Sequence, residues 1–296
     1  MGIGPPIISL YHQMARDGLL NNIHEVINLG SQDIYCPGYE NLLNSVFTCM
    51  GRPSLSNDQI LGLANGGPAR EFYEWLGWTY NCIDTDGRHG ALVLDLNYDG
   101  VPNEHLRRYD LTTNYGTTEH LINQLNAFRV LHDLTKQGGL IVHILPFVGC
   151  VNHGFFTYQP SFFNALAKFN SYEVLGMWFN LNTSLPSLIP WHSELLQHIH
   201  VSPLGDSVLV VVTRKMFDAK FCVPFQNIYE FEQIDSNLGR YQYIVDGDLL
   251  NGNRIARVSN QGFAGLPNPD GLVEQISWRA LFRELVRRFS RPWRRS

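Results

Sequence analysis

The chain has 296 residues, enough for one large domain or two small ones, and 44% of them are hydrophobic, so it can bury a substantial core. Only 17% are charged, and the longest apolar runs have the length of strands, which excludes fibrous, disordered and membrane-spanning proteins. The net charge of −5 is unevenly distributed. Trp278–Ser296 holds seven arginines and one glutamate, a net +6, so the rest of the chain sums to −11.

The cysteines indicate the compartment. There are five, an odd number, and no Cys-x-x-Cys pair suggests zinc or redox chemistry. The N-terminus lacks the basic and apolar regions of a signal peptide. We therefore expect a reduced, cytoplasmic protein.

Short apolar runs alternate with stretches of helical periodicity along the chain. This alternation predicts an α/β fold, doubly wound around a mostly parallel seven-stranded sheet. Helices are expected at 7–20, 69–76, 118–134 and 160–169, and strands at 24–29, 80–84, 91–96, 109–113, 140–145, 172–180 and 207–214. Residues 31–68, rich in Gly, Pro, Ser and Asn, read as an inserted cap with one helical patch at 40–50.

Polar residues follow four of these strands, and ligands of open α/β sheets bind at the carboxyl ends of strands. The candidates at these strand ends are Asn28, Gly30, Ser31, Gln32 and Asp33 at the first strand, Asp84 and Thr85 at the second, Asp95 and Leu96 at the third, and Asn114 at the fourth. Gly30 allows close approach of a ligand, and Asp84 can accept hydrogen bonds from a ribose diol. Taken singly, such residues are more often turns or helix caps.

The order of these motifs resembles the class I S-adenosylmethionine-dependent methyltransferases over roughly 23–214. The closest local match is Tyr109-Asp110-Leu111-Thr112-Thr113-Asn114, then Thr118-Glu119-His120-Leu121, then Leu134-Thr135-Lys136-Gln137-Gly138-Gly139-Leu140-Ile141. It is similar to the family's stretch in which a fourth strand, a Glu-His helix start and a Lys-Pro-Gly-Gly turn precede the fifth strand. The resemblance implies a Rossmann-like methyltransferase fold that binds S-adenosyl-L-methionine.

The same resemblance assigns roles at the strand ends. It implies a glycine turn at Gly30, a ribose contact at Asp84 and an adenine contact at Asp95. The sequence departs from the family in two places: Asn28 stands where an acidic residue is usual, and the turn has a single glycine, so Asp33 is a candidate substitute for the missing charge. Only six residues separate Asp84 from Ala91, so the third strand is either displaced or reached by an irregular loop.

Two histidines compete as the base that an acceptor hydroxyl or amine needs. His120 starts the predicted helix after the fourth strand, and His153 follows the fifth strand in Gly149-Cys150-Val151-Asn152-His153-Gly154-Phe155-Phe156. Their alternatives are a capping histidine and a solvated loop histidine. His198 and His200 would lie on the same face of a strand, but the sequence offers no third ligand, so we predict no metal site.

The last residues have a regular helical pattern. Apolar residues from Trp278 to Phe289 form one stripe of an amphipathic helix, with arginines on another face. This basic C-terminal helix predicts a peripheral contact with an anionic membrane or a protein, unless it packs against the acidic body. A nucleic-acid substrate is disfavoured because the body lacks a basic track.

The expected organisation is a methyltransferase domain at 1–222 and a C-terminal extension at 223–296. The expected function is methyl transfer from S-adenosyl-L-methionine to a small-molecule or glycan-type acceptor, with displacement in line at the methyl carbon. The alternative is a non-catalytic binding or scaffold protein of the same fold that acts through its basic helix. A nicotinamide-dependent oxidoreductase is disfavoured because the Gly-x-Gly-x-x-Gly turn is missing.

Overall fold

The computed structural model describes residues 2–180, 183–191 and 206–225. All of them belong to the first of the two compact units, 1–263 and 264–296, into which the chain divides. The predicted helix of Trp278–Ser296 and the pair His198 and His200 lie outside the described residues. Within the described part, no helix is long and apolar enough to cross a membrane.

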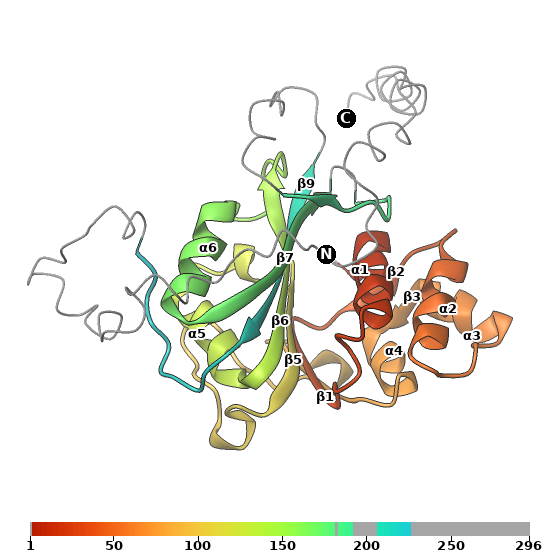
Figure 1. Cartoon of the computed structure of the whole chain (residues 1–296), viewed down its shortest axis with the longest axis horizontal. Coiled ribbons are helices and arrows are strands. Elements are labelled where there is room, and N and C mark those ends of the chain that lie inside the picture. Colours follow the sequence, from red (N-terminus) through yellow and green to blue (C-terminus); the bar gives the residue numbers. More distant parts are fainter. Residues whose placement is uncertain (1, 181–182, 192–205, 226–296) are drawn as a thin grey trace, which may run out of the picture. The chain divides into compact units, whose positions relative to one another are not determined.

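A central sheet organises the described residues (Figure 1). Its strands are β1 (Glu25–Leu29), β4 (Thr79–Ile83), β5 (Tyr109–Tyr115), β6 (Thr135–Val148), β7 (Tyr172–Asn180), β8 (Ile189–Pro190) and β9 (Ser207–Lys215). Their order across the sheet is β4-β1-β5-β6-β9-β7-β8. The pairs β4/β1, β1/β5 and β5/β6 are parallel, and β9 runs antiparallel to both β6 and β7, so five of the seven strands share one direction. The predicted fold class is confirmed.

Helices cover both faces of this sheet. The α-helices of the described residues are α1 (Pro5–Arg16), α2 (Glu40–Cys49), α3 (Asn57–Ala64), α4 (Ala69–Trp75), α5 (Gln124–Leu134) and α6 (Pro160–Phe169). Figure 1 shows α5 and α6 on one face and α1 and α4 on the other. One cluster of the core forms under α5 and α6, where Phe128 and Phe163 pack on Ile27, Ile141 and other inward-facing strand residues.

The sequence prediction is wrong for the strand at 91–96. Only Leu92 pairs with the sheet, through an isolated parallel bridge to Ile83, and Val93 is 67% exposed. A short 3₁₀ turn, Arg88–Gly90, fills the connection instead of a helix. Six residues are too few for a full parallel crossover, so the chain reaches the sheet edge and leaves it again. The seventh strand is the two-residue β8, which the sequence did not predict.

The segment 31–68 is a small subdomain built on the end of β1. It pairs β2 (Asp33–Tyr35) with β3 (Asn65–Pro68), and α2 and α3 lie between these strands. A capping box at Ser56 and Gln59 starts α3. Ile34 also bridges to Ile3, so the N-terminal segment is held against the insertion.

The helix predicted at 118–134 begins later than expected. Thr118–His120 forms a separate 3₁₀ turn, and α5 starts only at Gln124, where the Asn123 side chain accepts the amide hydrogen of Asn126. The side-chain oxygen of Asn97 accepts the amide hydrogens of Ile122 and Asn123 at 3.0 and 3.1 Å. These contacts give the turn around Glu119 a geometry of its own.

Candidate active site

The carboxyl ends of β1, β4, β5 and β6 meet at one edge of the sheet. Leu29 is in register with Ile83 on one side and with Asn114 on the other, and Asn114 is in register with His143. The loops that leave these strands therefore start side by side.

The turn after β1 is shaped by Gly30. Its φ is +82°, and a Cβ at this position would lie 2.6 Å from Oγ1 of Thr117 and 2.9 Å from Nε2 of Gln32. Only glycine fits such a position without displacing its neighbours. Ser31 Oγ and Gln32 Oε1 are buried; the Ser31 side chain interacts with the Cys82 thiol, whereas Gln32 Oε1 accepts no hydrogen bond from the described residues. Buried polar atoms of this kind point to a ligand that is not part of the chain.

Asp84 follows β4 and faces this turn. One carboxylate oxygen accepts the amide hydrogen of Ser31 at 2.9 Å, and the other accepts that of Thr85 at 2.8 Å. A carboxylate can accept about four hydrogen bonds, so both oxygens keep capacity for a diol. The structure thus brings together five of the predicted cofactor residues: Gly30, Ser31, Gln32, Asp84 and Thr85.

Asn28 and Asn114 are used inside the protein. Asn28 is fully buried, accepts a hydrogen bond from Thr113 at 2.6 Å and lies 3.4 Å from the Tyr80 hydroxyl. Asn114 donates to Thr118 Oγ1 at 2.9 Å and so holds the turn that precedes Glu119. Their side chains have internal partners, and their direct contact with a cofactor stays a prediction.

The other three predicted cofactor residues lie on different segments. Asp33 starts β2 and pairs with His89 at 3.4 Å. Asp95 accepts the backbone and side-chain N–H groups of Asn97, and the carbonyl of the buried Leu96 accepts from Asn126 at 2.9 Å. The 95–97 loop is therefore joined to the start of α5.

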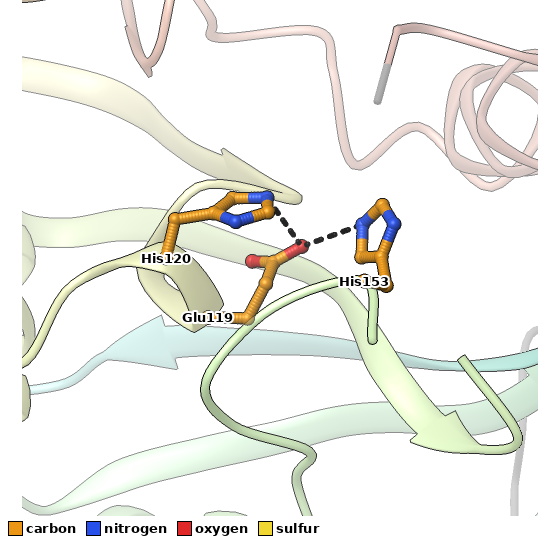
Figure 2. Close-up of side chains that lie close together, drawn as sticks. All are labelled: Glu119, His120 and His153. Carbon is orange, nitrogen blue, oxygen red and sulfur yellow. Dashed lines mark ion pairs between the residues drawn. The ribbon is translucent and has the colours of Figure 1, made fainter. Parts of the chain in front are cut away.

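Glu119 and the two candidate bases form one cluster, which we call the Glu119 cluster: Glu119, His120 and His153 (Figure 2). Glu119 Oε1 lies 3.8 Å from Nε2 of His120 and 3.6 Å from Nε2 of His153. The two rings have centroids 5.2 Å apart. The glutamate side chain is 0% exposed, whereas those of His120 and His153 are 46% and 36% exposed. One buried carboxylate thus lies beneath two imidazoles that solvent and ligands can reach.

Backbone contacts hold the two halves of this cluster together. The Glu119 carbonyl accepts the amide hydrogens of Phe155 at 2.8 Å and Phe156 at 3.2 Å. A Cβ on Gly154 would lie 2.9 Å from Cγ of Glu119, so the loop after β6 presses directly on the glutamate. The Tyr158 hydroxyl donates a hydrogen bond to Thr118 Oγ1 at 2.9 Å, which fixes the turn that carries Glu119.

Burial sets the electrostatics of the cluster. It raises the pKa of Glu119 to about 7, because the charged form loses its hydration. Burial, with His153 as a second cause, lowers the pKa of His120. Burial also raises the pKa of Cys150 to about 11, with contributions from Asp206 and Glu119, so this thiol is not an activated nucleophile.

Sequence reasoning found both histidines but not Glu119 as their partner. In the sequence this glutamate stands out only as part of the Glu-His motif, and nothing there shows that the loop after β6 returns to it. The available signal was the adjacency of Glu119 and His120 together with a histidine after the next strand. Of the aromatic residues at 155–163, Tyr158, Phe162 and Phe163 pack with Phe128 in the core, and Phe155 is 67% exposed.

No protein-family model matches the sequence, and no curated protein matches it. Among solved structures, the chain is similar to a protein named as a sarcosine dimethylglycine methyltransferase from Galdieria sulphuraria. The identity is 12%, the match covers 70% of this chain and 84% of that one, and the TM-score is 0.41.

Two further solved structures show the same kind of likeness. The 1,6-didemethyltoxoflavin-N1-methyltransferase of Burkholderia thailandensis, solved with S-adenosylhomocysteine, is 10% identical over 72% of this chain and 80% of that one, with a TM-score of 0.37. The [4+2]-cyclase SpnF is 10% identical over 71% and 80%, with a TM-score of 0.40. Because all three identities are below 25% and all three TM-scores are below 0.5, no conclusion about this chain rests on the likeness.

Proposed function

We propose that this chain is an S-adenosyl-L-methionine-dependent methyltransferase that acts on a small-molecule or glycan-type acceptor. One observation carries the proposal: a glycine turn whose buried Gln32 Oε1 has no partner among the described residues adjoins the loop that bears the Glu119 cluster. The link is direct, because Thr117 lies two residues before Glu119 and donates a hydrogen bond to the Leu29 carbonyl at 2.7 Å. A cofactor turn and a group of acid–base residues side by side suit a transfer between two bound ligands.

The residues of the glycine turn fit this cofactor. Gln32 Oε1 offers a buried acceptor that has no partner among the described residues, Ser31 Oγ lies beside it, and Gly30 leaves the backbone open to close approach. Asp84 keeps lone pairs for a ribose. When bound, S-adenosyl-L-methionine supplies an electrophilic methyl group, so the chain mainly has to align the acceptor and exclude water.

The Glu119 cluster is the proposed acceptor side. His120 or His153 takes the proton of an acceptor hydroxyl or amine at a ring nitrogen, and the buried Glu119 carboxylate stabilises the imidazolium that forms. A body charge of −11 favours a small neutral or cationic acceptor over a phosphate backbone. In the same proposal, the basic helix of Trp278–Ser296 is a contact for a membrane or a protein.

The second candidate is a non-catalytic binding or scaffold protein of this fold. It is favoured by the state of Asn28, whose side chain is neutral and engaged by Tyr80 and Thr113. A protein that had lost cofactor binding would have no need for a buried Gln32 oxygen without a partner among the described residues, so we rank this candidate second.

Calorimetric titration of the full chain with S-adenosylmethionine and S-adenosylhomocysteine tests the proposal. We expect binding by the wild type and about tenfold or greater weakening in Asp84→Asn, since a contact to the ribose is lost. Asp86→Asn is the matched control, because Asp86 lies in the same loop, is exposed and accepts only from Arg88 in the described structure. Absence of binding by the wild type, or equal weakening in both variants, would overturn the proposal.

A further inference from the structure

We propose that Glu119, His120 and His153 bind one divalent metal ion of the borderline class, with Zn²⁺ as the leading example. The binding itself is independent of the proposed methyl transfer. Its role rests on that proposed function: the ion presents an open coordination position to an acceptor oxygen, with both histidines as ligands in place of one histidine as base.

The geometry provides three ligand atoms at one point. One atom from each residue of the cluster lies within 4.8 Å of the other two. Ligands at about 2.1 Å from a tetrahedral zinc lie roughly 3.4 Å from one another. The distances of 3.6 and 3.8 Å from Glu119 Oε1 to the histidines are already close to that value. Because both rings are partly exposed, each side chain has room to rotate and bring its ring nitrogen to the distance that a shared ion requires.

The buried carboxylate is an independent sign of a missing cation. Neither carboxylate oxygen of Glu119 accepts a hydrogen bond from another described residue, although the side chain is 0% exposed. Leaving a buried polar group without partners costs about 1–3 kcal/mol, and more for a charged group. In the described structure the only groups paired with it are the two imidazoles, which are cationic only when protonated. A bound cation would remove this cost.

The surroundings keep the ligands in place. Thr118, next to Glu119, is fully buried and receives hydrogen bonds from Asn114 and Tyr158 at 2.9 Å each. The amides of Phe155 and Phe156 hold the Glu119 backbone to the segment that follows His153. Metal sites depend on such supporting contacts, because they fix the direction of each ligand before the ion arrives.

The ligand types select the class of ion. Two imidazoles and one carboxylate suit Zn²⁺ and other divalent transition metals, whereas Mg²⁺ and Ca²⁺ prefer sites made of oxygen alone. A site with three protein ligands leaves at least one position for water or substrate, which is the arrangement of catalytic rather than structural zinc sites. The partial exposure of both histidines is consistent with this open position.

The test is a titration of the full chain, freed of histidine tags and stripped with a chelator, with Zn²⁺ by calorimetry and with Co²⁺ by its visible d–d absorption. We expect one equivalent of Zn²⁺ to bind, and Co²⁺ to give the spectrum of a nitrogen- and oxygen-ligated site. Glu119→Gln keeps the shape of the side chain and should weaken binding by about tenfold or more. His153→Gln should do the same at a partly exposed position where folding is preserved.

A matched control comes from a second pair of histidine and carboxylate. His89 Nε2 lies 3.4 Å from Asp33 Oδ1 with no third ligand among the described residues, and the positive φ of His89 suits asparagine. His89→Asn should leave cation binding unchanged. No binding by the wild type, or equal binding by wild type, Glu119→Gln and His153→Gln, would overturn the proposal. Cation binding without any S-adenosylmethionine binding would instead overturn the proposed function and leave the metal site standing.

Discussion

Thr117 donates a hydrogen bond from its hydroxyl to the Leu29 carbonyl at 2.7 Å, and the same hydroxyl occupies the place that a side chain on Gly30 would need. One threonine therefore both closes the end of β1 and excludes every residue except glycine from the turn. It also places the proposed cofactor turn next to the Glu119 cluster.

The first prediction concerns Gly30→Ala. The new Cβ would lie 2.6 Å from Thr117 Oγ1 at a φ of +82°, so both strain and collision oppose it. Gly38→Ala is the matched control, because Gly38 has a φ of +85° with nothing within 4 Å. We expect the control to lose about 1 kcal/mol of stability from strain and Gly30→Ala to lose more. Chemical denaturation measures both losses of stability. Similar losses in the two variants would contradict the prediction that Thr117 collides with a side chain at position 30.

The second prediction concerns Gly154→Ala. A Cβ here would lie 2.9 Å from Cγ and 3.0 Å from the carbonyl oxygen of Glu119, so it would push the loop after β6 away from the glutamate. We expect about tenfold weaker Zn²⁺ binding with unchanged affinity for S-adenosylmethionine. Gly100→Ala, where nothing lies within 4 Å, is the control. Equal loss of both ligands would indicate general unfolding instead.

The third prediction concerns pH. Complete burial lowers the pKa of His143 to about 3. The unfolded chain binds a proton below a pKa of about 6.5 and the folded chain does not, so stability is full above that pH and falls as the pH is lowered. Between about pH 7 and pH 5 this histidine should cost roughly 2 kcal/mol of unfolding free energy.

Denaturation of His143→Gln at both pH values checks this expectation. The variant should lose less stability than the wild type on acidification. Equal losses of stability in the wild type and in His143→Gln between about pH 7 and pH 5 would contradict the prediction.

The fourth prediction concerns Asp110 in β5, which is buried, accepts the amide hydrogens of His24 and Glu25 at 2.9 Å and pairs with Lys136. Burial alone would raise its pKa, but these hydrogen bonds hold the pKa below its usual value. Asp110→Asn should cost about 2 kcal/mol near neutral pH. Because a lowered pKa stabilises only above the unfolded value, the difference should shrink below about pH 4.

Glu25→Gln is the comparison for Asp110→Asn. Glu25 pairs with Arg108 on the surface, where the two side chains are 30% and 38% exposed. An exposed pair contributes about 0–1 kcal/mol, so this variant should be nearly neutral in a denaturation experiment. Equal costs for the two substitutions would show that burial of Asp110 is not the cause.

The fold was predictable from the sequence where a buried element leaves a clear run of apolar residues. The run Ser207–Arg214 is β-branched and almost wholly buried, and no other structure suits it. The run 91–96 is as apolar, but the length of its connection prevents a strand, and apolar character alone does not reveal this. The late start of α5 depends on Asn97, a distant residue that takes two amide hydrogens.

The site was predictable as separate residues and not as an assembly. Gly30 and Asp84 follow strands that are neighbours in the sheet, so their meeting follows from topology. His153 reaches Glu119 only because a loop with the positive φ angles of Cys150 and Asn152 turns back over it. Asparagine tolerates a positive φ, so Asn152 is a possible turn residue, but nothing in the sequence marks Cys150 as one. The pairing of a buried carboxylate with two histidines therefore needed three-dimensional information.

The position of β9 bears on how the protein is made. In the sheet, β7 is joined to β6 only through β9, which comes later in the chain. During synthesis, Tyr172–Asn180 leaves the ribosome with only the two-residue β8 to pair with until β9 has followed. Until then the apolar edge of β6 is open to other chains. Slow translation across 181–206 would lengthen this vulnerable interval, so the yield of folded protein should depend on chaperones that cover strand edges.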